Sequence, residues 1–97
     1  MNFEWDEAKN RSNIRKHGFE LGEAQEMFFG PLLVRPDLRG EYGEECWLGI
    51  GMTNGRIAFV AFAQTSSDTI RIISLRKANH GEREEYEEAL QDGLEAN

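Results

Sequence analysis

The sequence has few of the residues and segments that would assign a protein class at once. It contains one cysteine, Cys46, among 97 residues, so no disulfide can form within the chain. The chain begins without a basic and then apolar leader segment, and we therefore expect a cytoplasmic protein. The longest apolar run, residues 57–63, is far shorter than the ~20 apolar residues of a membrane-spanning helix. We expect no membrane association.

Short motifs of nucleotide and metal sites are also missing. The sequence has no GxxxxGK loop, no GxGxxG, no CxxC and no HExxH. Its two histidines, His17 and His80, are far apart in the sequence and lack neighbours with metal-ligand spacing. We therefore expect neither a cofactor nor a metal ion. The lone Cys46 is expected to be a small buried hydrophobic residue rather than a nucleophile.

Positive charge is scarce overall but unevenly distributed. The chain has 18 acidic residues against 11 Lys and Arg and a net charge of −7, which argues against a nucleic-acid partner. Six of the acids and none of the bases lie in residues 84–97, which leaves 12 acids against 11 bases in residues 1–83. The acidic end is interpreted as a solvated helix face or as a docking surface for a basic partner. The rest of the chain is nearly neutral and can hold a local basic cleft.

Local patterns predict one α+β domain over residues 1–97. Asp6 is a good N-cap for a helix over residues 7–17, and Gly18 would end that helix in the left-handed conformation. Apolar spacing predicts a second helix over 21–29 and a last helix over 80–94, with Tyr86 and Leu90 on its buried stripe. Extended segments are expected at residues 3–5, 32–35 and 70–76, with a loop over 36–45.

The clearest local signal is a hairpin turn. The stretch Thr53-Asn54-Gly55-Arg56 is typical of a two-residue turn, because Asn and Gly tolerate positive φ angles. If Thr53 faces Arg56, one face of the hairpin is apolar and the other has Gly49 and Gly51 at its centre. Such small residues indicate a close approach, either by a packed helix or as the floor of a groove.

The strand over residues 70–76 is expected to be central, because apolar residues occur on both of its faces. Strict alternation places Ile70, Ile72 and Ser74 on one side of the sheet. It places Arg71, Ile73 and Leu75 on the other.

Cations follow this strand at a helix start. An unpaired buried guanidinium is costly, so Arg76 and Arg83 must reach water, a carboxylate or a phosphate. For Arg76-Lys77, next to helix amides that favour anions, a phosphate site is the preferred interpretation. Arg83 has a surface pair with Glu87 as its alternative, and Arg71 a cross-strand salt bridge.

Several residues together carry a family resemblance. In the first half of the chain they are Phe3-Glu4-Trp5-Asp6, Lys9, Asn13, Lys16-His17-Gly18, Phe28 and Glu44-Glu45-Cys46-Trp47. In the second half they are Ile70-Arg71-Ile72-Ile73-Ser74, Arg76, Ala78, Glu82-Arg83 and Tyr86. With these residues the chain resembles, over nearly its whole length, the BrnT family of bacterial ribonuclease toxins.

The resemblance implies a RelE-like fold with two N-terminal helices, a mainly antiparallel sheet of four to five strands, and a C-terminal helix. It also implies a metal-independent ribonuclease that cleaves mRNA through attack by the RNA 2′-hydroxyl and inhibits translation. The implied partners are RNA and a cognate ribbon-helix-helix antitoxin similar to BrnA. Operator DNA would be bound only indirectly, through the antitoxin.

The reaction needs a base, cations for the developing charge and an acid. The predicted catalytic residues are Arg76, Arg83 and His17, although a histidine at a helix end is also typical of a C-terminal cap. The predicted RNA-binding residues are Lys9, Lys16, Arg71, Ser74, Lys77 and Tyr86. Tyr86 also lies on the apolar stripe, which favours a core position for it over RNA contact.

Two positions depart from the pattern of many family members. Cys46 stands where an arginine follows the loop glutamate, and residues 64–67 contain no arginine. Two phosphate contacts are therefore missing. The alternative function is a catalytically weak or inactive toxin homologue that binds its antitoxin in transcriptional autoregulation.

Overall fold

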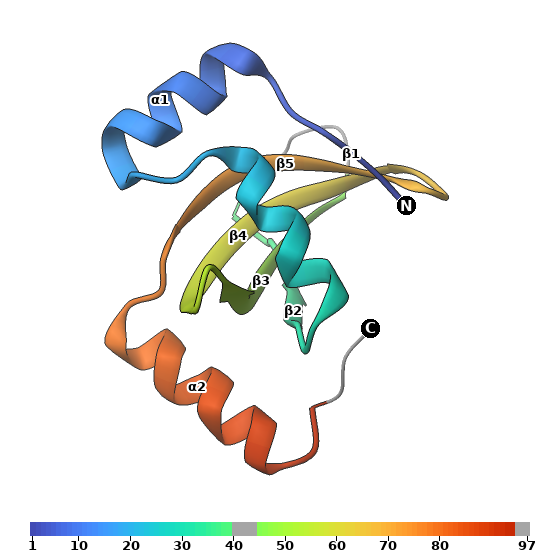
Figure 1. Ribbon diagram of the computed structural model, residues 1–97. Helices are drawn as coiled ribbons and strands as arrows, with labels where there is room; N and C mark the ends of the chain where they lie inside the picture. Colours follow the sequence, from blue (N-terminus) through green and yellow to red (C-terminus); the bar gives the residue numbers. More distant parts are fainter. Residues whose placement is uncertain (40–44, 95–97) are drawn as a thin grey trace.

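The computed structural model describes residues 1–39 and 45–94, which form a five-stranded sheet with helices on both faces (Figure 1). In chain order the elements are β1 (Asn2–Glu4), α1 (Glu7–His17), the 3-10 helix η1 (Leu21–Phe29), β2 (Leu33–Pro36), β3 (Cys46–Thr53), β4 (Arg56–Ser66), β5 (Thr69–Lys77) and α2 (His80–Gln91). The strand order is β1-β5-β4-β3-β2, with β1 parallel to β5 and the other pairs antiparallel. The predicted α+β fold is confirmed, whereas half of the predicted loop over 36–45, including Glu44, lies outside the described residues.

The first helix has the predicted boundaries. The Asp6 side chain accepts a hydrogen bond from the backbone N–H of Lys9 at 3.0 Å, and Gly18 closes the helix at φ 77° with its N–H donated to the Ile14 carbonyl. η1 begins at a capping box in which Glu20 and Glu23 each accept from the other's backbone N–H. It buries Ala24 and Met27 and, in cyan and teal, lies across the sheet in Figure 1.

Two apolar clusters occupy the two faces of the sheet. The face that we call the η1 face packs Val60, Phe62 and Ile72 of the sheet against Met27 and Phe28 of η1. The opposite face, which we call the α2 face, has a smaller cluster consisting of Leu48, Ile50, Phe59 and Ala61 of the sheet with Tyr86 of α2. Figure 1 shows α2, in orange and red, beyond one end of the sheet. The strands therefore extend past the area that α2 covers.

The hairpin of β3 and β4 has the predicted register, with Thr53 opposite Arg56 and Cys46 opposite Ala63. The close approach to its glycines is made by packed side chains. A Cβ atom on Gly49 would lie 3.1 Å from both Leu32 Cδ1 and Val60 Cγ1. At Gly51 a Cβ atom would lie 3.5 Å from the Cβ of Met27 in η1, so the predicted packed helix is found there rather than a groove.

Replacing Gly49 by valine is expected to lower the free energy of unfolding by about 1–3 kcal/mol, because the added atoms overpack a closed contact. Urea denaturation measures this change. The matched control is Gly30→Ala, since a Cβ on Gly30 would meet no atom within 4 Å. Equal unfolding midpoints for the two variants would contradict the prediction.

The predicted alternation of β5 is wrong after Ile72. Ala61 pairs with Ser74, but the next residue, Phe62, pairs with Ile72, so Ile73 is the extra residue of a β-bulge. The bulge reverses the alternation, and Leu75 joins Ile72 in the cluster on the η1 face. Ser74 then faces the α2 side. The alternation of residues along β5 does not reveal this bulge, because the bulge arises from the pairing of β5 with β4.

The predicted stripe of the last helix needs a similar correction. α2 ends at Gln91, and Tyr86 is its buried apolar residue, whereas 40% of Leu90 is exposed. Glu82 is also buried on this side of the helix. The buried side of α2 therefore includes a carboxylate one turn before Tyr86, which the predicted apolar stripe did not contain.

Candidate active site

Two hollows lie between α1 and β5. Lys9, Ile73 and Ser74 line both of them, which shows that the hollows are adjacent. The larger, of about 320 Å³, also contains Arg71 and extends to Cys46 of β3 and to Asp37 and Arg39. The smaller, of about 240 Å³, is lined by Lys16 and His17 at the end of α1. Five of the predicted site residues thus line one continuous surface, which we call the α1–β5 cleft.

The two elements of this cleft are held together by a buried side chain. The Asn13 amide donates to the carbonyls of Phe19 at 2.9 Å and Leu75 at 2.8 Å, and its oxygen accepts from the Leu75 N–H at 3.1 Å. Asn13 itself is 6% exposed. The position of Lys9, Lys16 and His17 relative to β5 therefore depends on a fully satisfied amide.

Arg71 forms an ion pair with a carboxylate on the neighbouring strand. Its Nε donates to Glu4 Oε2 at 2.9 Å across the parallel β1–β5 pair. The cross-strand salt bridge expected as the alternative for Arg71 is confirmed. The guanidinium still lines the α1–β5 cleft, but with part of its charge compensated.

Arg76 is held by a carboxylate as well. Its Nη1 and Nη2 donate to the two oxygens of Glu82, both at 2.9 Å, and Nη1 also donates to the Lys77 carbonyl at 3.2 Å. The guanidinium lies 4.2 Å from the centre of the Phe59 ring. This geometry clamps the end of β5 to the first turn of α2.

Glu82 is itself held in place by a second set of hydrogen bonds. Its Oε1 also accepts from the Asn79 N–H at 2.9 Å, which completes a capping box at the start of α2. Burial alone would raise the pKa of Glu82, but the bonds from Arg76 and from the Asn79 N–H outweigh it, so the pKa lies below its ordinary value. Glu82 is therefore ionised at neutral pH.

The remaining predicted residues lie around the junction of β5 and α2. Arg83 donates from Nη1 to the Ala78 carbonyl at 3.5 Å, and within residues 1–39 and 45–94 it forms no salt bridge, with Glu87 or otherwise. Lys77 is exposed. Tyr86 is 1% exposed and its hydroxyl donates to the Pro31 carbonyl at 2.9 Å, so the structure gives it the core position expected as its alternative.

Comparisons with known proteins identify the family of this chain. Residues 5–82 match the family model described as "Ribonuclease toxin, BrnT, of type II toxin-antitoxin system". The chain belongs to the BrnT family. One solved relative is the crystal structure of the Brucella abortus ribonuclease toxin BrnT, which is 32% identical and superposes with a TM-score of 0.68. The match covers 82% of this chain and 99% of the Brucella chain. No curated protein matches the sequence.

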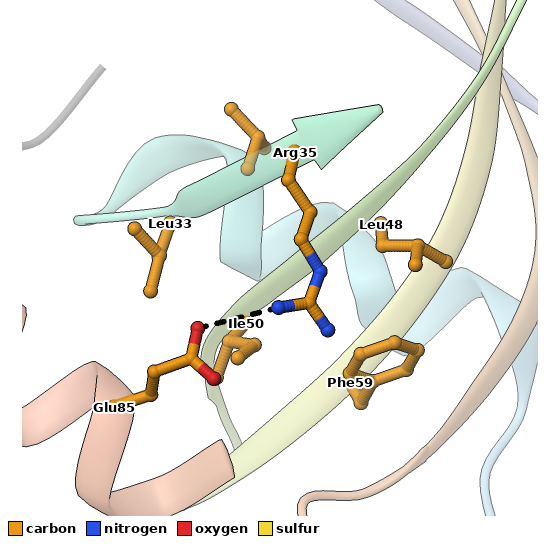
Figure 2. A pocket seen from close by; sticks show the side chains of 7 residues that line it. Leu33, Arg35, Leu48, Ile50, Phe59 and Glu85 are labelled. Carbon is orange, nitrogen blue, oxygen red and sulfur yellow. Dashed lines mark hydrogen bonds and ion pairs between the residues drawn. The ribbon is translucent and has the colours of Figure 1, made fainter. Parts of the chain in front are cut away.

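In this BrnT chain the sequence analysis missed two arginines on the α2 face. Arg35 pairs with Leu48 in the sheet and so points to that face, and Arg39 lines the α1–β5 cleft. Figure 2 shows Arg35 beside an apolar hollow lined by Leu48, Ile50 and Phe59, with its guanidinium paired to Glu85 at 3.4 Å. The register of β2 could not be predicted because a long loop separates it from β3.

Two further properties of this BrnT chain concern metals and membranes. The described residues contain no group of three or more His, Cys, Asp or Glu side chains that could hold a metal ion. Within the same residues, no helix is long and apolar enough to cross a membrane. Cys46 is buried on β3, as the sequence predicted.

Proposed function

We propose that this BrnT family member is a metal-independent endoribonuclease that cleaves mRNA through attack by the RNA 2′-hydroxyl and thereby inhibits translation. The observation that carries the proposal is the convergence of Lys9, Lys16, His17 and Ser74 on the α1–β5 cleft. Lysine and hydroxyl side chains of this kind can contact RNA phosphates and so position the strand.

The proposed roles follow from side-chain chemistry. His17 lines the cleft, and we assign its imidazole the role of general acid or base. Lys9 and Lys16 hold the RNA backbone, and Ser74 orients it by hydrogen bonding. Arg76 and Arg83, at the end of β5 and the start of α2, stabilise the negative charge of the transition state.

A protein partner belongs to the same proposal. We expect a ribbon-helix-helix antitoxin similar to BrnA to neutralise the toxin and to bind operator DNA in the complex. The basis is the type II toxin-antitoxin description of the family. The acidic outer side of α2 is exposed at Glu84, Glu87 and Glu88 and offers one surface for a basic partner.

Induced expression of the wild-type protein in a bacterial host is expected to arrest growth, and the purified protein to cleave single-stranded RNA at an unchanged rate in EDTA. The products should carry a cyclic phosphate or a 3′-phosphate end, because the 2′-hydroxyl is the nucleophile. The control substrate is the same RNA with 2′-O-methyl groups, which should stay intact. Cleavage of the methylated RNA, or none of either RNA, would contradict the proposal.

A second candidate function is a non-catalytic module that binds its antitoxin for autoregulation. The ion pairs Arg71–Glu4 and Arg76–Glu82 favour it, because each commits an arginine to a carboxylate. Both candidates predict a stable complex with the antitoxin. Only the ribonuclease predicts cleavage of free RNA, so the cleavage assay separates them.

A further inference from the structure

The guanidinium of Arg76 has hydrogen-bonding capacity beyond its ion pair. A guanidinium carries five N–H groups in a plane: one on Nε and two on each Nη. Glu82 occupies one N–H of Nη1 and one of Nη2, and the Lys77 carbonyl occupies the second N–H of Nη1. The Nε–H and the second N–H of Nη2 have no partner among the residues that the structure describes.

These two N–H groups are neighbours on the same edge of the plane. The bonds to Glu82 take the end of the guanidinium, between Nη1 and Nη2, and the Lys77 carbonyl takes the outer side of Nη1. The edge formed by Nε and Nη2 is a parallel pair of donors, which matches two oxygens of a phosphate. The side chain is 35% exposed, so water or a ligand can reach it.

Three contacts fix the direction of this edge. The Glu82 carboxylate holds the end of the guanidinium, the Lys77 carbonyl holds one side, and the Phe59 ring lies 4.2 Å away. Glu82 is in turn fixed by the Asn79 N–H, and its side chain is 11% exposed. An arginine oriented in advance loses little side-chain entropy when it binds an anion.

We propose that Glu82 is a positioning residue, which holds Arg76 so that its free Nε–Nη2 edge binds a phosphate of the RNA with two hydrogen bonds. The ion pair is then part of the site rather than a competitor of the substrate. The kinetic test of this inference rests on the proposed ribonuclease function.

Glu82→Gln is the sharpest variant, because glutamine at this position of a capping box still accepts from the helix N-terminus. The start of α2 is therefore retained, and the variant loses only the ion pair with two hydrogen bonds to Arg76. We expect kcat for a single-stranded RNA of mixed sequence to fall by about tenfold to 100-fold, since small misplacement of a reacting group has effects of that size. KM should rise by less than about tenfold, because the misplaced edge also binds the phosphate less tightly before the reaction, and the urea unfolding midpoint should change little.

Arg76→Lys keeps the positive charge but removes the paired donors. Its kcat should fall on the order of 100-fold, as for loss of a group that stabilises transition-state charge. The double variant Arg76→Lys with Glu82→Gln should be no slower than Arg76→Lys, because Glu82 acts through Arg76. A purely structural role would change stability and leave the activity of the folded fraction unaltered. The matched control is Arg11→Lys, an exposed arginine of α1 that does not line the cleft.

Two results would overturn the inference while leaving the ribonuclease proposal intact. The first is a Glu82→Gln variant that cleaves RNA at least as fast as the wild type. The second is a double variant whose loss of kcat equals the product of the losses in the two single variants. If the wild type cleaves no RNA, the proposed function fails. The inference can then be tested alone by measuring the affinity of each variant for a fluorescent 2′-O-methyl RNA, which cannot be cleaved. Glu82→Gln and Arg76→Lys should then each weaken binding by about tenfold, the effect of one lost charge-assisted hydrogen bond. Unchanged binding would overturn the inference.

Discussion

Replacing Asn13 by aspartate is expected to lower the free energy of unfolding by about 3 kcal/mol or more, one of the largest effects of any single polar substitution in this chain. The amide of Asn13 donates to two buried carbonyls, of Phe19 and Leu75. A carboxylate has no proton to donate to either of them. Its charge would instead face two carbonyl oxygens in a site that is 6% exposed in the wild type.

Urea denaturation at neutral pH measures the loss, and Asn10→Asp is the matched control. Asn10 is similarly buried on α1, but its side-chain oxygen accepts from the Leu21 N–H at 2.7 Å, a role that a carboxylate can fill. The control should lose less than half as much stability. Equal losses for the two variants would show that charge burial, and not the direction of the hydrogen bonds, decides the result.

Arg83→Ala is expected to reduce RNA cleavage by about 100-fold while the protein stays folded, because the group is proposed to stabilise transition-state charge. The only bond of its guanidinium among the described residues is the long one to the Ala78 carbonyl. Its removal therefore leaves no buried charge unpaired. Growth arrest on expression should be relieved, and the urea midpoint should match that of the wild type.

Arg76→Ala is the informative comparison. This variant should lose cleavage and also stability, because Glu82 is left buried without its cation. Cleavage by Arg83→Ala at the wild-type rate would remove Arg83 from the catalytic site. Loss of folding in Arg83→Ala would show that it has a structural role that the described contacts do not reveal.

Much of the fold follows from short-range chemistry that a sequence displays. The Asp6 cap, the Gly18 ending and the Asn54-Gly55 turn each depend on one or two residues and their own backbone angles. Once the turn is placed, the whole β3–β4 register follows from strand pairing. The resemblance to the BrnT family rests on similar local motifs, and the family match over residues 5–82 confirms it.

The candidate site was predicted less completely, because its residues belong to different elements. Five of the residues predicted for the site, Lys9, Lys16, His17, Arg71 and Ser74, line one cleft, and their roles there stay a prediction. Their common location depends on contacts that no local pattern contains. The β-bulge at Ile73 turns Ser74 to the α2 face, and Asn13 docks α1 against β5.

The element types and the hairpin register depend on each residue and its near neighbours, so they could be predicted from the sequence. Three features depend on tertiary packing instead: Glu82 clamps Arg76, Arg35 points to the same face of the sheet as the cleft, and Arg39 lines the cleft. The physical reason is that ion pairs and burial depend on distances between segments. Those distances are set when the sheet and helices pack together.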